Sequence, residues 1–119
     1  MTFKIYKSFF STREEVLEDL KETGHWPTTY VSEKSPELPL HWHNLDITGY
    51  VMSGGTYLLD EQGMRHDLDP GDKLEIPRGS LHAEGEVLVT TTYIVGTEVP
   101  GQLLEQLQML SKDDPDRIT

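Results

Sequence analysis

Short runs of apolar and β-branched residues, each ended by Gly, Pro or Asp, dominate the middle of the chain. The clearest of these runs lie at 28–31, 45–52, 56–59 and 87–95. Runs of this length, with turn-forming residues between them, predict β-strands, and together they predict an all-β domain rich in loops. The run at 87–95 is mostly β-branched and is interpreted as one core strand or two.

Helical spacing occurs near the two ends of the chain. Ser11 and Glu14 have the spacing of a capping box, and Gly24 can end a helix, so a helix is predicted over 12–23. A second short helix is predicted over 101–111, where leucines recur three or four residues apart. A short edge strand is expected at 3–7. Both helices are expected to pack outside the strands.

Length, charge and cysteine content narrow the class of protein. The 119 residues fit a single domain, with its strands at about 26–97. The net charge of −11 makes nucleic acids and anionic membranes unfavourable partners, because both repel an acidic surface. The chain has no cysteine, no apolar run long enough for a membrane span and no visible signal peptide, so we expect a cytoplasmic protein without disulfides.

Three histidines suggest a site for chemistry. His41 and His43 are two residues apart, so their side chains share a face if this segment is extended. His82 follows the turn-forming sequence Pro77-Arg78-Gly79 and begins another extended segment. If the two segments are neighbours, three imidazoles converge. They then predict a site for a divalent transition metal such as Fe, Zn, Ni, Cu or Mn.

These residues resemble the two sequence motifs of the cupin superfamily, and in particular its small, single-domain RmlC-like members. His41, His43 and Gly54 match the first motif. Four residues match the second motif in order and spacing: Gly71, Pro77, Gly79 and His82. The resemblance covers about residues 38–97. It implies a jelly-roll β-barrel, also called a double-stranded β-helix, with His41, His43 and His82 as metal ligands inside it.

The chain departs from the family pattern at the fourth metal ligand. The motif glutamate is replaced by Ile47, or by Thr48 in an alternative register. Asp46 lies one position away from it, and Glu84 shares a face with His82 if the strand is unbroken. Asp46, Thr48 and Glu84 are therefore candidates for the fourth ligand or for a role in the pocket. For Glu84, a position in solvent at the rim of the barrel is the simpler interpretation.

The strand at 45–52 determines what surrounds the metal, because alternate residues face opposite sides. One set would make the interior apolar: Leu45, Ile47, Gly49 and Val51. The other set would offer polar groups: Asp46, Thr48, Tyr50 and Met52. The comparison with the family favours the first set inside, although a one-residue bulge would interchange them.

Several other residues have a structural and a functional interpretation. Trp26 is expected to pack on the barrel after the first helix; the alternative places His25 or Trp26 at the mouth of a pocket. His66 is expected on the surface of a strand. Tyr93 and the neighbouring threonines are ordinary strand residues in the simpler interpretation, and pocket hydroxyls in the other.

Two functional hypotheses follow. A metal on three imidazoles can polarise a carbonyl, acidify water or bind a chelating substrate. The resemblance implies a metal-dependent dioxygenase, isomerase or lyase acting on a small polar molecule inside the barrel. It equally implies a binding or sensing module without turnover, whose metal site is degenerate or empty. The sequence identifies no catalytic residue. The resemblance and the apolar stripe of the second helix also imply a homodimer.

Overall fold

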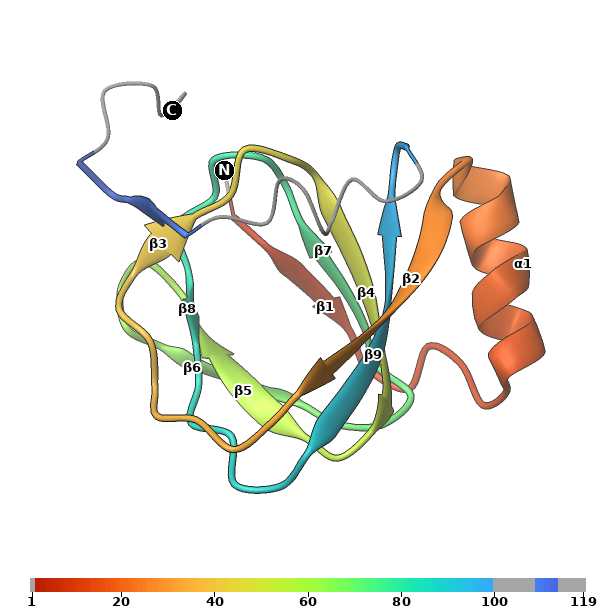
Figure 1. The fold of residues 1–119 in the computed structure, drawn as a ribbon, viewed down its shortest axis with the longest axis horizontal. Helices are drawn as coiled ribbons and strands as arrows, with labels where there is room; N and C mark the ends of the chain where they lie inside the picture. Colours follow the sequence, from red (N-terminus) through yellow and green to blue (C-terminus); the bar gives the residue numbers. More distant parts are fainter. Residues whose placement is uncertain (1, 100–108, 114–119) are drawn as a thin grey trace.

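The computed structural model describes residues 2–99 and 109–113. Strands predominate, and a single helix lies near the N-terminus of the described part of the chain (Figure 1). In chain order the elements are β1 (Lys4–Tyr6), α1 (Arg13–Thr23), β2 (Trp26–Ser32), β3 (His41–Trp42), β4 (Ile47–Ser53), β5 (Thr56–Leu59), β6 (Arg65–Leu68), β7 (Lys73–Ile76), β8 (Ala83–Glu84), β9 (Thr91–Thr97) and β10 (Leu110–Ser111).

Two layers of antiparallel strands face each other (Figure 1). The larger layer is a five-stranded sheet in the order β1-β7-β4-β9-β2. The facing layer contains the sheet β6-β5-β8 and the strand pair β10-β3. The expected all-β architecture is confirmed. The described strands form separate sheets of a sandwich, however, and not a single closed barrel.

Strand β4 separates two apolar clusters, because its alternate residues face opposite layers. Val51 is buried between the sheets together with Leu58 of β5. Tyr50 faces the other way and packs beneath α1 with Val16 and Leu20. The apolar set of residues on β4 is therefore the inward one, as the family comparison favoured.

Helix α1 is bounded by residues whose chemistry suits its two ends. Thr12 is the N-cap: its side chain accepts the backbone N–H of Glu15 at 3.2 Å, and Glu15 accepts the backbone N–H of Thr12 at 3.1 Å. The capping box is therefore Thr12 with Glu15, one residue later than predicted. Gly24 ends the helix in the left-handed region, with φ of 76°, a conformation that glycine adopts without strain.

A buried ion pair joins α1 to the large sheet. Lys73 on β7 is buried and donates to Asp19 of α1 at 2.6 Å. The hydroxyl of Tyr50 donates to the same carboxylate at 2.5 Å. The ammonium of Lys73 also lies 4.7 Å from the centre of the Phe9 ring. Because a buried charge is unfavourable without partners, these contacts explain how the sheet accommodates a lysine under the helix.

The prediction of a C-terminal helix over 101–111 is wrong for its last two residues. Leu110 and Ser111 form strand β10, which pairs with β3 in register with Trp42 and His41. The indole N–H of Trp42 donates to the carbonyl of Ser111 at 2.7 Å, so a long-range contact overrides the local helical spacing. Residues 101–108 of the predicted helix lie outside the described residues. No described helix has the length and apolar character that a membrane crossing requires.

The strand prediction for 87–95 is correct only in part, and the prediction for Trp26 is wrong. The strand predicted over 87–95 begins only at Thr91, and Leu88 and Val89 are exposed. Their β-branched and apolar character suits a strand, but the chain bends there, after Val87 has paired with Ser35. Trp26 is exposed at the first residue of the edge strand β2, where we expected it to pack on the other strands.

Candidate metal centre

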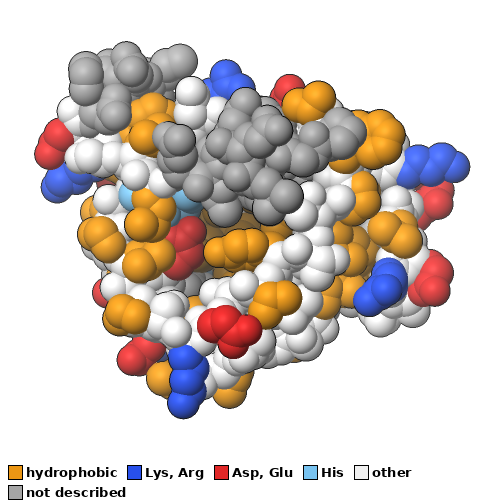
Figure 2. Space-filling view, viewed as in Figure 1, with side chains coloured by type: hydrophobic (Ala, Val, Ile, Leu, Met, Phe, Trp, Pro, Cys, Tyr) orange, Lys and Arg blue, Asp and Glu red, His pale blue; other side chains and the backbone are white. Residues whose placement is uncertain are grey.

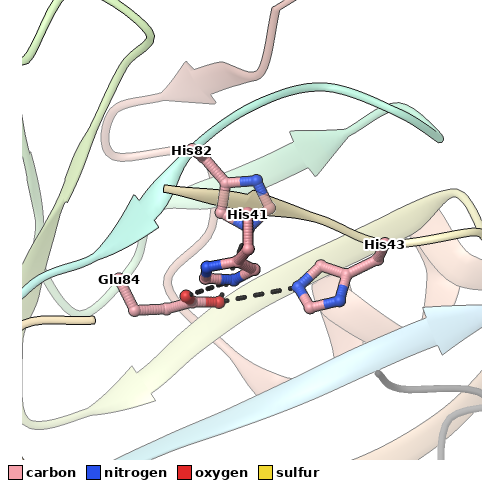
Figure 3. Close-up of side chains that lie close together, drawn as sticks. All are labelled: His41, His43, His82 and Glu84. Atoms are coloured by element: carbon pink, nitrogen blue, oxygen red, sulfur yellow. Dashed lines mark ion pairs between the residues drawn. The ribbon is translucent and has the colours of Figure 1, made fainter. Parts of the chain in front are cut away.

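Three imidazoles and one carboxylate meet between the two layers (Figure 3). They come from two short segments: His41 opens β3 and His43 follows it, while His82 precedes β8 and Glu84 ends it. One nitrogen or oxygen atom from each residue lies within 4.8 Å of those from the other three. All three histidines are buried. This set of donor atoms is one that transition metals bind.

Backbone pairing brings the two segments together. The N–H of His41 donates to the carbonyl of His82 at 2.9 Å, and the N–H of His82 donates to the carbonyl of His41 at 3.0 Å. The N–H of Gly79 donates to the carbonyl of His43 at 3.1 Å. The two sequence motifs are therefore joined by main-chain hydrogen bonds, which place their side chains on one face.

Two of the imidazoles are oriented by carbonyls of their own segments. Nδ1 of His41 lies 2.7 Å from the carbonyl oxygen of Pro39, and Nδ1 of His82 lies 3.0 Å from that of Ser80. A carbonyl can only accept, so Nδ1 carries the proton in both rings. In a neutral ring, Nε2 then has a free lone pair directed at the cluster. This is the arrangement by which proteins prepare histidines as metal ligands.

The cluster leaves buried polar atoms without partners. Among the described residues, Nε2 of His41, Nε2 of His82 and Oε2 of Glu84 are buried and make no hydrogen bond. His41 and His82 are only 3% and 0% exposed. Nε2 of His41 and Oε2 of Glu84 lie 2.7 Å apart, but not in the orientation of a hydrogen bond. Buried polar atoms are rarely unpaired, and one shared cation would satisfy all three. The residues present therefore fit a metal ion.

The charges at the cluster also favour a cation. Burial raises the pKa of Glu84, but the imidazoles of His41, His43 and His82 together lower it well below its ordinary value. Burial lowers the pKa of His41, and the contact with Glu84 outweighs this and raises it. Glu84 is therefore a carboxylate, and it supplies a negative charge where the imidazoles meet.

The structure separates the three candidates for a fourth ligand. Glu84 points at the imidazoles (Figure 3), with its side chain still 37% exposed. Asp46 precedes β4, and its carboxylate accepts the backbone N–H of Arg78 at 2.8 Å. Thr48 faces the α1 side of β4, with its hydroxyl 3.4 Å from Nδ1 of His25. Asp46 and Thr48 therefore lie outside the cluster, because β4 directs Ile47 and Gly49 inward.

The other two histidines lie elsewhere. His25 follows α1 and contacts Thr48 on the outer face of the large sheet. His66 lies on the surface of β6, as predicted, and its Nε2 is 2.9 Å from Asp60. Each contacts a polar residue that is not part of the cluster. They serve as natural controls for experiments on the three clustered histidines.

A cavity of about 320 Å³ opens between the layers beside the cluster. Figure 2 views this side of the molecule and shows histidine and acidic side chains next to hydrophobic ones around a hollow. His43 and Glu84 belong to the cavity wall, so the cavity reaches the cluster. Most of the remaining wall is apolar, with contributions from Leu38, Ile47, Leu58, Leu68, Leu74, Ile76, Val87 and Val95. The exceptions include Tyr30, Ser32, Ser35, Thr56 and Tyr93.

Sequence analysis did not find all of these features. The carbonyls of Pro39 and Ser80 orient the histidines, but every residue has a carbonyl, so no sequence signal marks them. Tyr30 lines the cavity because it pairs with Tyr93 across β2 and β9. That pairing could have been found only by aligning the two strands in the correct register.

Comparison with known proteins supports the fold. No protein-family model and no curated protein matches the chain. Among solved structures, a DUF861 family protein from Thermotoga maritima is similar, with a TM-score of 0.58 and 22% identity over 80% of this chain and 98% of that one. The polyketide cyclase RemF from Streptomyces resistomycificus is also similar, with a TM-score of 0.54 and 22% identity over 78% of this chain and 63% of that one.

A third similar structure is a cupin-2 domain containing protein from Shewanella frigidimarina. Its TM-score is 0.50 and its identity 20%, over 62% of this chain and 71% of that one. Similarity at this level of identity concerns the fold, which agrees with the one implied by the sequence motifs. The activities of these proteins are their own.

Proposed function

We propose that this chain, whose fold is that of the cupins, binds a divalent transition metal through His41, His43, His82 and Glu84. The metal would act on a small molecule held in the adjacent cavity. The observation that carries the proposal is the set of buried, unpaired atoms at the cluster: Nε2 of His41, Nε2 of His82 and Oε2 of Glu84. Without a cation, none of the three has a hydrogen bond, and the contact between His41 and Glu84 is the closest charged contact among them.

The donor set suits Fe, Zn, Ni, Cu or Mn, since imidazole and carboxylate ligands are common to all of them. A metal bound there would supply Lewis acidity, or redox chemistry if it is iron or copper. The chain's own residues would then position the ligand. His43 and Glu84 form the part of the cavity wall nearest the cluster, and the apolar wall excludes water from the remainder.

The lining of the cavity refines the expected ligand. The sequence predicted a small polar molecule, but aliphatic side chains make up most of the wall. The volume of about 320 Å³ is at the lower end of the range for small-molecule pockets. We therefore propose a small molecule with an apolar body and at least one oxygen that can reach the metal. Whether it is turned over or only bound distinguishes an enzyme from a sensing module.

Metal content tests the proposal. The untagged protein would be purified, supplied with Fe, Zn, Ni, Cu or Mn in turn, and analysed by mass spectrometry and equilibrium dialysis. A His41→Ala/His82→Ala variant removes two predicted ligands. A His25→Ala/His66→Ala variant removes the two histidines outside the cluster and is the matched control. We expect about one metal per chain in the wild type and the control, and none at this site in the first variant.

The contrary result is equally clear. If all three proteins bind the same amount of every metal, or none binds any, the cluster is not a metal centre. The chain would then be a ligand-binding or structural module with a degenerate site. The homodimer and the cytoplasmic location stay predictions from the sequence.

A further inference from the structure

The cavity beside the candidate metal centre contains a second polar group, the phenol of Tyr93. Tyr93 lies on β9 and pairs directly with Tyr30 on the edge strand β2. The two ring centres are 6.2 Å apart, and both side chains line the cavity. The Tyr93 ring packs against the apolar cluster between the sheets. Its position is therefore fixed by packing, which is independent of any hydrogen bond made by its hydroxyl.

The hydroxyl of Tyr93 is available to a ligand. It makes no hydrogen bond to another residue within the described part of the chain, although the wall around it is mainly apolar. Burial raises the pKa of Tyr93 to about 12, and the nearby charges of Glu84 and Tyr30 act in the same direction. At neutral pH the phenol is therefore uncharged and can donate a hydrogen bond.

The charge of the wall limits what can bind. None of the described residues that line the cavity is Lys or Arg, and Glu84 adds a negative charge. A phosphate or free carboxylate placed away from the metal would lose its hydration without gaining a cation. Sugar phosphates are therefore poor ligands for this cavity.

We propose that the site accepts an uncharged, mostly apolar molecule that presents one oxygen to the metal and a separate hydrogen-bond acceptor to Tyr93. This inference rests on the proposed function, because it needs a metal at the cluster. Tyr93 acts as a specificity-determining residue, and Tyr30 keeps its ring in place. The aliphatic side chains of the wall contact the apolar body of the ligand.

Three catechols test the proposal as probes, measured by anaerobic calorimetry with Co(II)-loaded protein. Each carries a metal-binding diol. 3,4-Dihydroxyacetophenone adds a neutral acceptor at the far end, 4-ethylcatechol adds an apolar group of similar size, and 3,4-dihydroxybenzoate adds an anion. The proteins are the wild type, Tyr93→Phe and Tyr6→Phe. Tyr6 pairs with Glu75 and does not line the cavity, so its variant is the matched control.

In the wild type, we expect the ketone to bind more tightly than the benzoate. Tyr93→Phe should lower the affinity for the ketone by about two- to tenfold, which is the effect of losing one hydrogen bond. It should leave the affinity for 4-ethylcatechol unchanged. Tyr6→Phe should change neither. Comparing the ketone-to-ethyl ratio of affinities between the variant and the wild type cancels the difference in acidity between the two diols, because that difference is the same in both proteins.

The proposal is overturned if Tyr93→Phe leaves the ketone-to-ethyl ratio unchanged, or if the benzoate binds as tightly as the ketone. It is also overturned if no probe binds to metal-loaded protein. In each of these cases cobalt is still bound, so the metal centre survives. Absence of cobalt binding in the wild type would instead remove the proposed function and this inference with it. Tyr93→Phe should bind cobalt as the wild type does, which separates ligand recognition from metal binding.

Discussion

His41 and His82 form a single antiparallel bridge in which each backbone N–H donates to the other's carbonyl, at 2.9 and 3.0 Å. Their ring centres lie 4.7 Å apart. The imidazoles are thus brought together by main-chain hydrogen bonds, which do not depend on a bound ion. We infer that the cluster is formed before any metal arrives, as a site built on strands and fixed by backbone contacts should be.

Replacing the one carboxylate of the cluster should weaken metal binding. Glu84→Gln keeps the size of the side chain but removes the charge that the three imidazoles surround. Loss of a partner outside the ligand set typically costs 10- to 100-fold in metal affinity, so we expect a loss of about tenfold or more here. Competition with a chromophoric chelator measures the affinity.

Two matched variants accompany this experiment. Glu86→Gln makes the same change on an exposed residue near β8, and Asp46→Asn tests the candidate whose carboxylate binds the backbone of Arg78. Both should keep the wild-type affinity. A larger loss from Asp46→Asn than from Glu84→Gln would show that the cluster has been assigned wrongly.

Gly85→Ala should disturb the metal centre through the backbone. A Cβ atom at Gly85 would lie 2.6 Å from the ring of Tyr57, whose hydroxyl donates to Glu37 at 2.7 Å. Because the ring is fixed, β8 must move and carry Glu84 with it. We expect a loss of about 1–3 kcal/mol in stability and a weaker metal site.

The control for this change is Gly49→Ala, where a Cβ atom would meet only the side chain of Leu74, at 3.8 Å. Urea unfolding and the chelator competition should both separate the two variants. Equal stability and equal metal affinity would mean that the close contact with Tyr57 does not position Glu84.

Asp72 should make the stability of the fold depend on pH in the acidic range. It is 2% exposed, accepts the backbone N–H groups of Ser8 at 2.9 Å and Asp69 at 2.8 Å, and pairs with Lys7. Burial raises the pKa of Asp72, but Lys7 and the two N–H groups lower it below its ordinary value. The folded pKa thus lies below the unfolded one, so this stability is present above about pH 4 and is lost as the pH falls.

Asp72→Asn should therefore cost about 1–3 kcal/mol at pH 7. The difference in free energy of unfolding between this variant and the wild type should shrink as the pH falls toward the folded pKa of Asp72. Urea unfolding at pH 7 and pH 3 measures this difference. Asp69→Asn removes an exposed partner of Lys7 and should have a small effect at both pH values. A difference that is the same at both pH values would contradict the role given to Asp72.

Removing one partner of the ion pair under α1 should destabilise the protein more than replacing both partners. Asp19→Ala leaves the buried Lys73 with only the longer contact to Glu75, at 3.9 Å, and we expect a loss of about 3 kcal/mol. The double variant Asp19→Ala/Lys73→Met should recover part of it, because no unpaired charge remains. Glu18→Ala, on the exposed face of α1, is the control. Thermal unfolding showing no recovery in the double variant would count against this view of the pair.

The fold was predictable because the motifs encode local backbone requirements. Gly54 illustrates this: its φ is 85°, and a Cβ atom there would lie 2.5 Å from the carbonyl oxygen of Thr90. Only glycine fits such a position, which explains why a glycine stands here. The spacing of His41 and His43 similarly follows from the two-residue repeat of an extended chain.

Long-range contacts explain what the sequence could not predict. Glu84 joins the cluster because β8 lies beside β5 and places the carboxylate next to the imidazoles, whereas local pattern alone also allowed a solvent position. Leu110 has helical spacing to other leucines but pairs with Trp42 across the fold. Leu88 and Val89 have strand character but lie in a bend. In the first two cases a partner distant in sequence decides the outcome.

X-ray absorption at the metal edge of zinc-loaded protein tests the central claim most directly. We predict a first shell with three imidazole nitrogens and carboxylate oxygen at about 2.0–2.2 Å, together with the outer-shell scattering typical of histidine. In Glu84→Gln the imidazole signal should persist while the oxygen contribution changes. A spectrum from oxygen ligands alone, without imidazole scattering, would contradict the assignment of His41, His43 and His82 as the metal ligands.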